Sequence, residues 1–414
     1  MKEAAYKLWN KLPSGECVHC GSFVLAAHDN GRLTKINFRY TNEYLAHPAA
    51  HDLDPIHAPL KESVFEYGTD GLTLPGFLDD MLPDKWGRAL IARHYSALEK
   101  RKIDPNDNIE ILNHLPESGI GALRAIPHDP NNPISTAPVY GMGLPIERLS
   151  LLDTGANKGH EYVDEDELQI LGLQLLVQGS NVGGARPKAL VYDDQHTYLA
   201  KFNRQQDTFN QVLVEHTCLE IARDAQIRTT DSITGQIGAK PYLLAKRFDT
   251  SPDGGRYHML TMNALLKDQE QQSDNRNATY NQLARILISY SCDPEADLKQ
   301  LFGQMLLNEV LNNRDDHLRN FSLMHTTKGW RLTPAYDIVP ELELNKYPQI
   351  GFGYNTFLPS LDQAQKAASA FNLTKNEAQA IADQIGLKMN DWITRLNYNG
   401  VPEQDASKLS RVIK

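Results

Sequence analysis

The order of apolar patterns after residue 180 is the feature that most limits what this chain can fold into. Two strand-like runs, at 189–192 and 197–203, are followed by an amphipathic helical pattern at 209–227. Two more strand-like runs lie within 231–248, and the apolar spacing beyond Asp249 is mainly helical. Strands grouped before helices are typical of α+β proteins. The order therefore predicts a small β-rich lobe followed by a helical lobe.

The N-terminal part of the chain has a β-rich pattern of its own. Apolar runs at 21–28 and 33–40 flank the turn sequence DNGR, and an Asn-Gly pair between such runs predicts a hairpin. An amphipathic helix is expected to begin near Asp84. A stretch rich in proline, asparagine and glycine, at 125–145, then interrupts the periodic patterns. We expect a domain boundary shortly after it, near residue 155.

These boundaries divide the 414 residues into three expected domains. Residues 1–155 form the N-terminal domain, residues 156–248 the β-rich lobe, which opens with a helix at 164–176, and residues 249–414 the helical lobe. A content of 41% apolar and 23% charged residues is ordinary for a soluble globular protein. No apolar run approaches the roughly 18 residues that span a bilayer, and the N-terminus lacks the apolar core of a signal peptide. We therefore expect a cytoplasmic protein without membrane contact.

Charge and cysteine content argue against two classes of site. The net charge of −10 argues against nucleic acid as a direct ligand, since no run of lysines and arginines counters it. Cys17 and Cys20 have the spacing of a metal or redox pair, but no second pair follows. We expect these two cysteines to lie in a strand of the N-terminal sheet and to have no metal-binding role.

A buried ion pair is predicted between Lys201 and Glu215. Glu215 falls within the apolar stripe of its helix, formed by Val212, Leu219 and Ala222, and a carboxylate that faces a core needs a cation. Lys201 lies in the preceding strand-like run. Kinases use a strand lysine paired with a helix glutamate to position the lysine against nucleotide phosphates. A purely structural ion pair, or a glutamate at the margin of the stripe, explains the same pattern, so the two residues alone leave these interpretations open.

A glycine-rich turn precedes this strand pair. The sequence GSNVGGARPK, residues 179–188, carries three glycines, which allow backbone N–H groups to approach an anion closely. It is neither a Walker loop nor a GxGxxG motif. Its place just before the strands that carry Lys201, together with the positive charge of Arg186 and Lys188, favours phosphate binding over a simple turn.

The sequence NNRDDHLRN contains the candidate catalytic loop. Asp315 and Asn320 are separated by four residues, the spacing at which a kinase aspartate accepts the substrate hydroxyl proton and an asparagine holds magnesium. This spacing is common by chance, but a predicted hairpin at 321–332 leads from it directly to Asp337. Oxygen ligands such as those of Asn320 and Asp337 suit Mg²⁺, which takes its remaining ligands from phosphates and water. We expect Asp316 to be solvated and His317 to lie on the nucleotide side.

With these elements in order, the sequence resembles the HipA family of toxin kinases from bacterial toxin–antitoxin systems. The matching segments are LPGFLDDMLPDKWG, GGARPK, YLAKF, LLAKRFD, NRDDHLRNFS and LTPAYDIVP, which occur in the family's order between residues 70 and 340. The C-terminal segment 371–396 is similar to the family's end. The resemblance implies a two-lobed protein-kinase-like fold with an additional N-terminal β-rich domain, and an ATP- and magnesium-dependent serine/threonine protein kinase.

The resemblance also assigns roles to individual residues. Asp315 matches the family's catalytic aspartate, Asn320 and Asp337 match its metal ligands, and Lys201 matches its phosphate-binding lysine. The remaining matches are to nucleotide-contacting segments: Gly183, Gly184, Ala185, Arg186, Pro187 and Lys188 in the ATP loop, Lys246, Arg247 and Phe248 in the hinge, and His317, Leu318, Arg319 and Tyr336. Lys246 departs from the family, where an acidic residue is frequent.

Partners and regulation are implied by the same resemblance. Known members phosphorylate an aminoacyl-tRNA synthetase and so arrest translation. A small helix-turn-helix antitoxin of the HipB type restrains them, usually in dimeric complexes that bind DNA through the antitoxin. Members often carry an autophosphorylated serine in the glycine-rich loop; the matching position here is Asn181, and Ser180 beside it is the only hydroxyl of that loop. Autophosphorylation at Ser180 is therefore a hypothesis.

Two alternatives stay open at the level of sequence. A small-molecule or lipid kinase would share the Asp315, Asn320 and Asp337 pattern, because that pattern does not specify the acceptor. A pseudo-kinase that acts as a co-repressor or binding partner would not need these catalytic residues. The presence of Lys201 and of the complete catalytic loop therefore argues against a pseudo-kinase.

Overall fold

The chain divides into two compact units. Unit 1 comprises Met1–Ala200 and Asp249–Asp274, and unit 2 comprises Lys201–Phe248 and Asn275–Lys414. The computed structural model describes residues 1–29, 31–67, 74–116, 119–128, 137–138, 140–141, 143–149, 188–267, 278–343 and 346–413.

Several predicted features lie outside the described residues. These are the helix at 164–176, the boundary near residue 155, and the glycine-rich loop up to Pro187, including Ser180. The division into three domains therefore stays a prediction.

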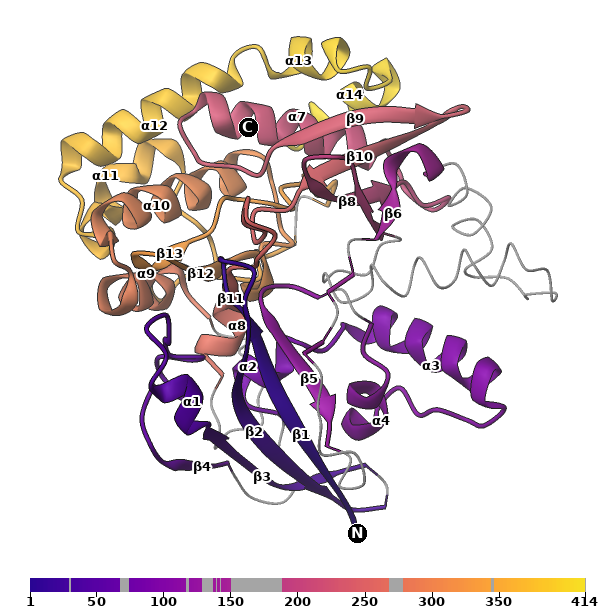
Figure 1. The fold of residues 1–414 in the computed structure, drawn as a ribbon. Helices are drawn as coiled ribbons and strands as arrows, with labels where there is room; N and C mark the ends of the chain where they lie inside the picture. The colour runs from indigo at the N-terminus through magenta and orange to yellow at the C-terminus, as the bar shows by residue number, and fades with distance from the viewer. Residues whose placement is uncertain are drawn as a thin grey trace. The chain divides into compact units, whose positions relative to one another are not determined.

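Unit 1 is built on an antiparallel sheet with the strand order β4-β3-β2-β1-β5. Its strands are β1 (Lys2–Lys11), β2 (Cys17–Ala27), β3 (Leu33–Tyr40), β4 (Val64–Tyr67) and β5 (Leu123–Pro127), and Figure 1 shows them side by side. Buried and accessible side chains alternate along β1 and β2, as expected for a sheet with one face in a core. The predicted pairing of 21–28 with 33–40 is confirmed, and all four cysteines are free.

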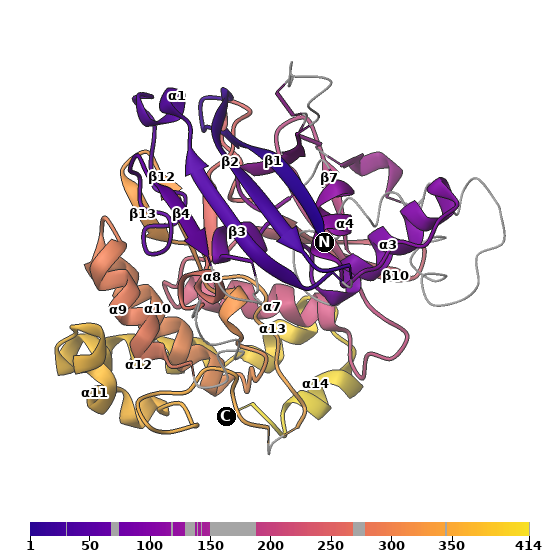
Figure 2. The ribbon, with the colours of Figure 1, turned by 90° about the horizontal axis from the view of Figure 1, so that it is seen from below.

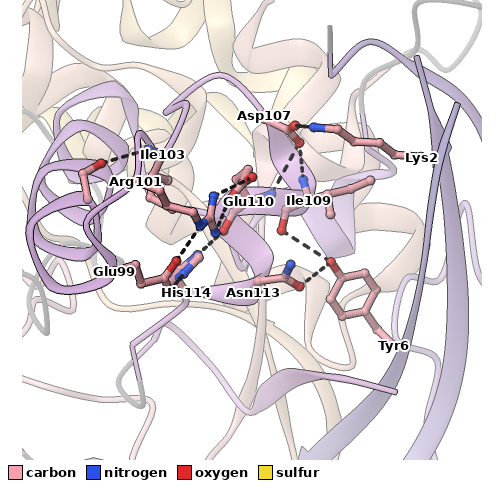
Figure 3. A network of polar contacts seen from close by, with 11 residues as sticks. Lys2, Tyr6, Glu99, Arg101, Ile103, Asp107, Ile109, Glu110, Asn113 and His114 are labelled. Carbon is pink, nitrogen blue, oxygen red and sulfur yellow. Dashed lines mark hydrogen bonds and ion pairs between the residues drawn. The ribbon is translucent and has the colours of Figure 1, made fainter. Parts of the chain in front are cut away.

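Helices α3 (Lys85–Glu99) and α4 (Asn108–Asn113) accompany this sheet. The Asp84 side chain caps α3 by accepting from Gly87 N, so the predicted helix start is confirmed. Figure 3 shows how polar contacts join α4 to the sheet: Lys2 binds Asp107, the cap of α4, and the Tyr6 hydroxyl donates to Asn113. Short helices α1 (Asn42–Leu45) and α2 (Gly76–Asp79) complete this part of unit 1.

The expectation of a helical chain directly after Asp249 is wrong for its first segment. Strand β11 (His258–Thr261) comes before the short helix α8 (Met262–Leu265), and both belong to unit 1. The Asp80 carboxylate accepts hydrogen bonds from the backbone N–H and the hydroxyl of Thr261. All four residues of β11 are buried, and a short run of that kind shows no periodicity by which a strand differs from a helix.

The β-rich part of the chain after residue 187 forms as predicted. In unit 1, β6 (Leu144–Pro145) pairs in parallel with β7 (Lys188–Tyr192). Strand β8 (Thr197–Phe202) runs across the division, so that Lys201 and Phe202 belong to unit 2. There, β9 (Ser232–Ile237) and β10 (Lys240–Lys246) form an antiparallel hairpin, on which α7 (Gln211–Asp224) packs.

Helices are the predominant regular structure of unit 2. Helix α10 (Pro294–Val310) is buried around nearly its whole circumference and packs against α9 (Tyr280–Tyr290) and α12 (Lys375–Met389), as Figure 2 shows. The hairpin of β12 (Ser322–Thr326) and β13 (Gly329–Leu332) contacts α9 and α10. The chain ends with α11 (Ala364–Ala367), α13 (Trp392–Tyr398) and α14 (Glu403–Leu409).

Among the described helices, none is long and apolar enough to cross a membrane.

Candidate active site

The candidate catalytic loop begins where helix α10 ends. Asn312, just past the helix, has φ 53°, a left-handed conformation that asparagine tolerates better than most residues. Its side-chain amide donates to Glu341 O at 2.6 Å, and Glu341 N donates back to Asn312 O at 2.9 Å. The turn that starts the loop is therefore fixed by the segment that follows Asp337.

The loop buries most of its polar side chains and exposes Asp315. Arg314 forms a buried ion pair with Glu309, 2.7 Å long, and also donates to Asn312 Oδ1. The prediction that Asp316 is solvated is wrong, since this residue is only 1% exposed. Tyr280 and the backbone N–H of Gln349 donate to its two carboxylate oxygens, and these distant donors replace the water that the sequence alone suggested. Asp315 is thus the acidic side chain that the loop presents at the surface.

Asp315 and Asn320 are tied together within the loop. Asn320 Nδ2 donates to Asp315 O at 3.0 Å, and a short 3-10 turn, Leu318–Asn320, brings the asparagine back toward the aspartate. Because its nitrogen is used in this way, Oδ1 of Asn320 is the atom that would coordinate a metal. Partial burial raises the pKa of the Asp315 carboxyl, His317 opposes this shift, and Asp337 adds to it.

The β12–β13 hairpin returns the chain to the loop and delivers Asp337. Tyr336, one residue earlier, donates from its hydroxyl to Arg319 O at 2.8 Å, and its ring lies 5.7 Å from that of Phe248. Asp337 itself has φ 58°. A left-handed residue other than glycine carries a strain of about 1 kcal/mol or more and often marks a functional position. The left-handed backbone at Asp337 therefore favours a functional role for its side chain.

Lys201 joins the strand, the helix and the hairpin at one point. Its Nζ lies 2.7 Å from Glu215 Oε1 and 2.8 Å from Asp337 Oδ1, so the predicted ion pair with Glu215 is present. Burial alone would lower the pKa of Lys201, but Asp337 and Glu215 outweigh it and hold the pKa above its ordinary value. The lysine is therefore charged at neutral pH.

A small polar cavity lies between helix α10, the candidate catalytic loop and the segment that follows the hairpin. Asn320 and Asp337 both line it, together with Gln304, Asn308, Asn313, Asp316, Phe321, Tyr336 and Ile338. Within the described part of the chain, the buried Oε1 of Gln304 has no hydrogen-bond donor. Carboxylate and amide oxygens around one cavity form the kind of donor set that magnesium prefers, so the residues present fit this ion.

The structure describes only some of the other residues that were predicted to contact the nucleotide. Gly183 to Pro187 lie outside the described residues, and Lys188 is the buried first residue of β7 in unit 1. In unit 2, Lys246 pairs through its backbone with Asp231, and Arg247 is buried. His317 is half-buried, and its Nδ1 has no hydrogen-bond partner among the described residues.

Sequence reasoning missed the polar residues behind the loop. Tyr280, Gln304, Asn308 and Asn313 are all at least 95% buried, and none was predicted to take part in the site. One signal was available: Gln300, Gln304 and Asn308 lie within a largely apolar helix at 298–311, and buried amides need partners. That signal could not reveal which partners they have.

Comparison with known families gives a consistent result. The family model of the HipA N-terminal domain matches residues 23–126, and that of the HipA-like C-terminal domain matches residues 180–393. The second match covers more than half of the chain and includes Lys201, Glu215, Asp315, Asn320 and Asp337.

Individual relatives are distant. A protein of Haemophilus influenzae named "Putative kinase" is 24% identical over 264 residues, which are 57% of this chain and 75% of the relative. "Putative kinase Y4mE" of Sinorhizobium fredii is 23% identical over 361 residues, 82% of this chain and 78% of the relative. "Toxin YjjJ" of Escherichia coli is 24% identical over 177 residues, 40% of this chain and 39% of the relative.

A solved structure shares the fold. HipA of Shewanella oneidensis MR-1, determined in a toxin–antitoxin complex with HipB and operator DNA, has a TM-score of 0.65 and covers 98% of this chain and 94% of its own. The identity is 15%, so this likeness speaks for the fold alone. It confirms the predicted α+β, kinase-like fold with its additional β-rich N-terminal domain, and the two family matches confirm the resemblance seen in the motifs. The chain therefore belongs to the HipA family.

Proposed function

We propose that this protein is a serine/threonine protein kinase that transfers the γ-phosphoryl group of ATP to a protein hydroxyl. The observation that carries the proposal is the convergence on Lys201, which binds Glu215 and Asp337 at once. A structural ion pair would need only one of these carboxylates. The second carboxylate belongs to Asp337, which follows the hairpin and has a left-handed backbone conformation. Asp337 lines a cavity together with Asn320, whose side chain is bound to the loop at Asp315.

Each residue has a distinct role in this proposal. Asp315, the accessible carboxylate of the loop, orients the acceptor hydroxyl and accepts its proton, and its raised pKa makes it a better base near neutral pH. Lys201, held by Glu215, binds ATP phosphate oxygens. Asn320 and Asp337 hold Mg²⁺, which when bound neutralises negative charge on those oxygens.

The family resemblance assigns several segments to nucleotide binding. These are Gly183–Lys188, Lys246–Phe248, His317–Arg319 and Tyr336. The contact between Phe248 and Tyr336 supports this assignment, because it places a hinge residue next to the metal-binding segment.

The proposal on partners is supported by the relatives rather than by the site. One relative is named a toxin, and the HipA of similar fold was solved with HipB and operator DNA. We infer that this protein is the toxin of a toxin–antitoxin pair in the cytoplasm, bound by a HipB-like antitoxin as a dimeric complex and reaching DNA through it. Its substrate would be a protein of translation, an aminoacyl-tRNA synthetase in the first instance.

A labelling experiment tests the proposal. Purified protein is incubated with γ-labelled ATP, magnesium and a lysate of the host, and Asp315→Asn is compared with wild type. We expect a labelled protein band that falls by roughly 10³-fold in the variant, the contribution of a well-placed general base. Asp362→Asn, which changes an exposed aspartate outside the site, serves as the matched control and should label like wild type.

The products of that experiment separate the alternatives. A labelled metabolite or lipid in place of a protein would indicate a small-molecule or lipid kinase. ATP binding without any transfer by wild type would indicate an inactive co-repressor or binding partner, and either result would overturn the proposal.

A further inference from the structure

A chain of buried polar side chains runs from helix α9 to the candidate catalytic loop. The Tyr280 hydroxyl accepts from Asn308 Nδ2 at 3.0 Å, and Asn308 Oδ1 accepts from Asn313 Nδ2 at 3.0 Å. Asn313 Oδ1 then accepts from the backbone N–H of Asp315 at 3.2 Å. Tyr280 is fully buried and the two asparagines are 3% exposed. The position of Asp315 is thus connected by hydrogen bonds to the first residue of α9.

Asp316 forms a second branch of the same hydrogen-bond network. Tyr280 donates its hydroxyl proton to Asp316 Oδ2 at 3.0 Å, and Gln349 N donates to Oδ1 at 2.8 Å. The segment around Gln349 is also fixed to the start of α9, because Tyr280 N donates to Gly351 O and Gly351 N donates to Ala278 O, both at 2.9 Å. One carboxylate therefore joins the loop, helix α9 and the segment beyond Asp337.

Burial of the Asp316 carboxylate lowers the stability of the fold. The hydrogen-bond donors to Asp316 are a phenol and backbone amides, all of them neutral, although its carboxyl is almost fully buried. Burying a carboxylate without a cation is unfavourable, and an amide or an apolar side chain of similar size would cost less. A buried acid beside the accessible acid of a site is instead typical of groups that serve the site.

We propose that Asp316 is a positioning residue, which acts through Tyr280, Asn308 and Asn313 to hold Asp315 and to couple it to the segment at residues 349–351. This inference rests on the proposed kinase function, because it gives Asp315 its role. Residues that act as a unit have strongly non-additive effects, and a displacement of about 1 Å in a catalytic group can cost about 10²-fold in rate.

Three variants test the network against a control. Asp316→Ala removes both acceptors, Asp316→Asn keeps the acceptor for Gln349 N, and Tyr280→Phe removes only the hydroxyl. The control is Asp405→Ala, which removes another buried carboxylate of the same unit, one that accepts from Asn210 N and contacts Lys408. The readouts are magnesium-dependent ATP hydrolysis in a coupled assay, which needs no identified acceptor, and ATP affinity measured by titration calorimetry.

The expected pattern separates positioning from stability. Asp316→Ala should lower kcat by about tenfold to a hundredfold, and KM for ATP should change less than about threefold, because the nucleotide-binding residues are untouched. Asp316→Asn should recover much of kcat. A double variant with Tyr280→Phe and Asp316→Ala should have nearly the kcat of Asp316→Ala alone, since both substitutions break the same network. Asp405→Ala should leave kcat within about twofold of wild type, whatever its effect on thermal stability.

Two results would overturn the inference. The first is a folded Asp316→Ala protein with the kcat of wild type. The second is a loss of kcat in Asp405→Ala equal to that in Asp316→Ala, which would mean that any buried carboxylate of unit 2 has the same effect. If instead wild type and Asp315→Asn hydrolyse ATP equally, the proposed function of Asp315 is at fault and not the network.

Discussion

Lys201 Nζ lies 2.8 Å from Asp337 Oδ1, although the two residues are 136 positions apart in the chain. This contact brings together a strand of the β-rich part and the end of the hairpin in the helical part. It also means that a metal bound by Asp337 must share that carboxylate with Lys201. Nucleotide phosphates, which attract both the lysine and the metal, would relieve this competition, so we expect metal and nucleotide to bind cooperatively.

Replacement of Lys201 by methionine should affect stability and activity together. The change removes the cation next to buried Glu215, and loss of one partner of a buried pair typically costs about 3 kcal/mol or more. Adding Glu215→Gln to this variant should recover part of the stability and none of the phosphoryl transfer. Urea unfolding followed by fluorescence measures the first effect, and ATP hydrolysis measures the second.

Lys299→Met provides the comparison for that experiment. Lys299 also contacts two carboxylates, those of Glu295 and Glu377, but its side chain is 37% exposed. Exposed pairs contribute at most about 1 kcal/mol, so this variant should unfold near the wild-type midpoint and remain active. Equal destabilisation by both replacements would argue against a special role for burial at Lys201.

Replacement of Asp337 by asparagine should weaken magnesium-dependent use of ATP. A neutral amide keeps the side-chain shape but removes a negative charge from the oxygen set that it forms with Asn320. We expect the magnesium concentration for half-maximal ATP hydrolysis to rise and the maximal rate to fall by about 10²-fold or more. A magnesium titration of the variant that overlays that of wild type would refute the metal-binding assignment.

The parts of the site that could be predicted from sequence depend on short-range periodicity. Glu215 falls on the buried face of its helix because of its spacing to Val212 and Leu219, and Lys201 lies in the strand just before. Likewise, the loop and Asp337 are separated by a single hairpin, which limits where the second aspartate can lie. Local pattern therefore sufficed for the groups that we assign to chemistry.

The parts that could not be predicted depend on long-range contacts. Asp316 looks like a solvated loop residue until Tyr280, 36 residues earlier, and Gln349, 33 residues later, are placed against it. Strand β11 is too short for its pattern to distinguish it from a helix. Both errors arise because burial at these positions is decided by elements that are distant in sequence.

Ser180 offers a test of self-inactivation. It is the only hydroxyl in GSNVGGARPK, and a phosphate there would add about two negative charges to a loop that we assign to ATP phosphates. We expect phosphopeptide mass spectrometry to detect phosphate at Ser180 after incubation of purified protein with ATP and magnesium. The phosphorylated form should bind ATP more weakly. The modification should be missing from Asp315→Asn, and detection there would point to a contaminating kinase.

The stability of the protein should depend on the protonation of Asp316 between about pH 4 and about pH 7. Burial raises the pKa of its carboxyl to about 7, and the hydrogen bonds from Tyr280 and from backbone amides only partly oppose this. In that range the folded protein retains a proton that the unfolded chain has released. By linkage, this group's contribution to the free energy of unfolding is largest below about pH 4, falls as pH rises toward about 7, and is constant above that.

Asp316→Asn isolates this contribution, because its amide resembles the protonated acid and does not titrate. Urea unfolding of both proteins between about pH 4.5 and about pH 8 measures this contribution. We expect the unfolding free energy of wild type, relative to that of the variant, to fall by a few kcal/mol as pH rises. Taking the difference cancels the other titrating groups, which both proteins share. A difference that stays constant over this range would mean that Asp316 is ionised throughout and that Tyr280 and the amides suffice to stabilise its charge.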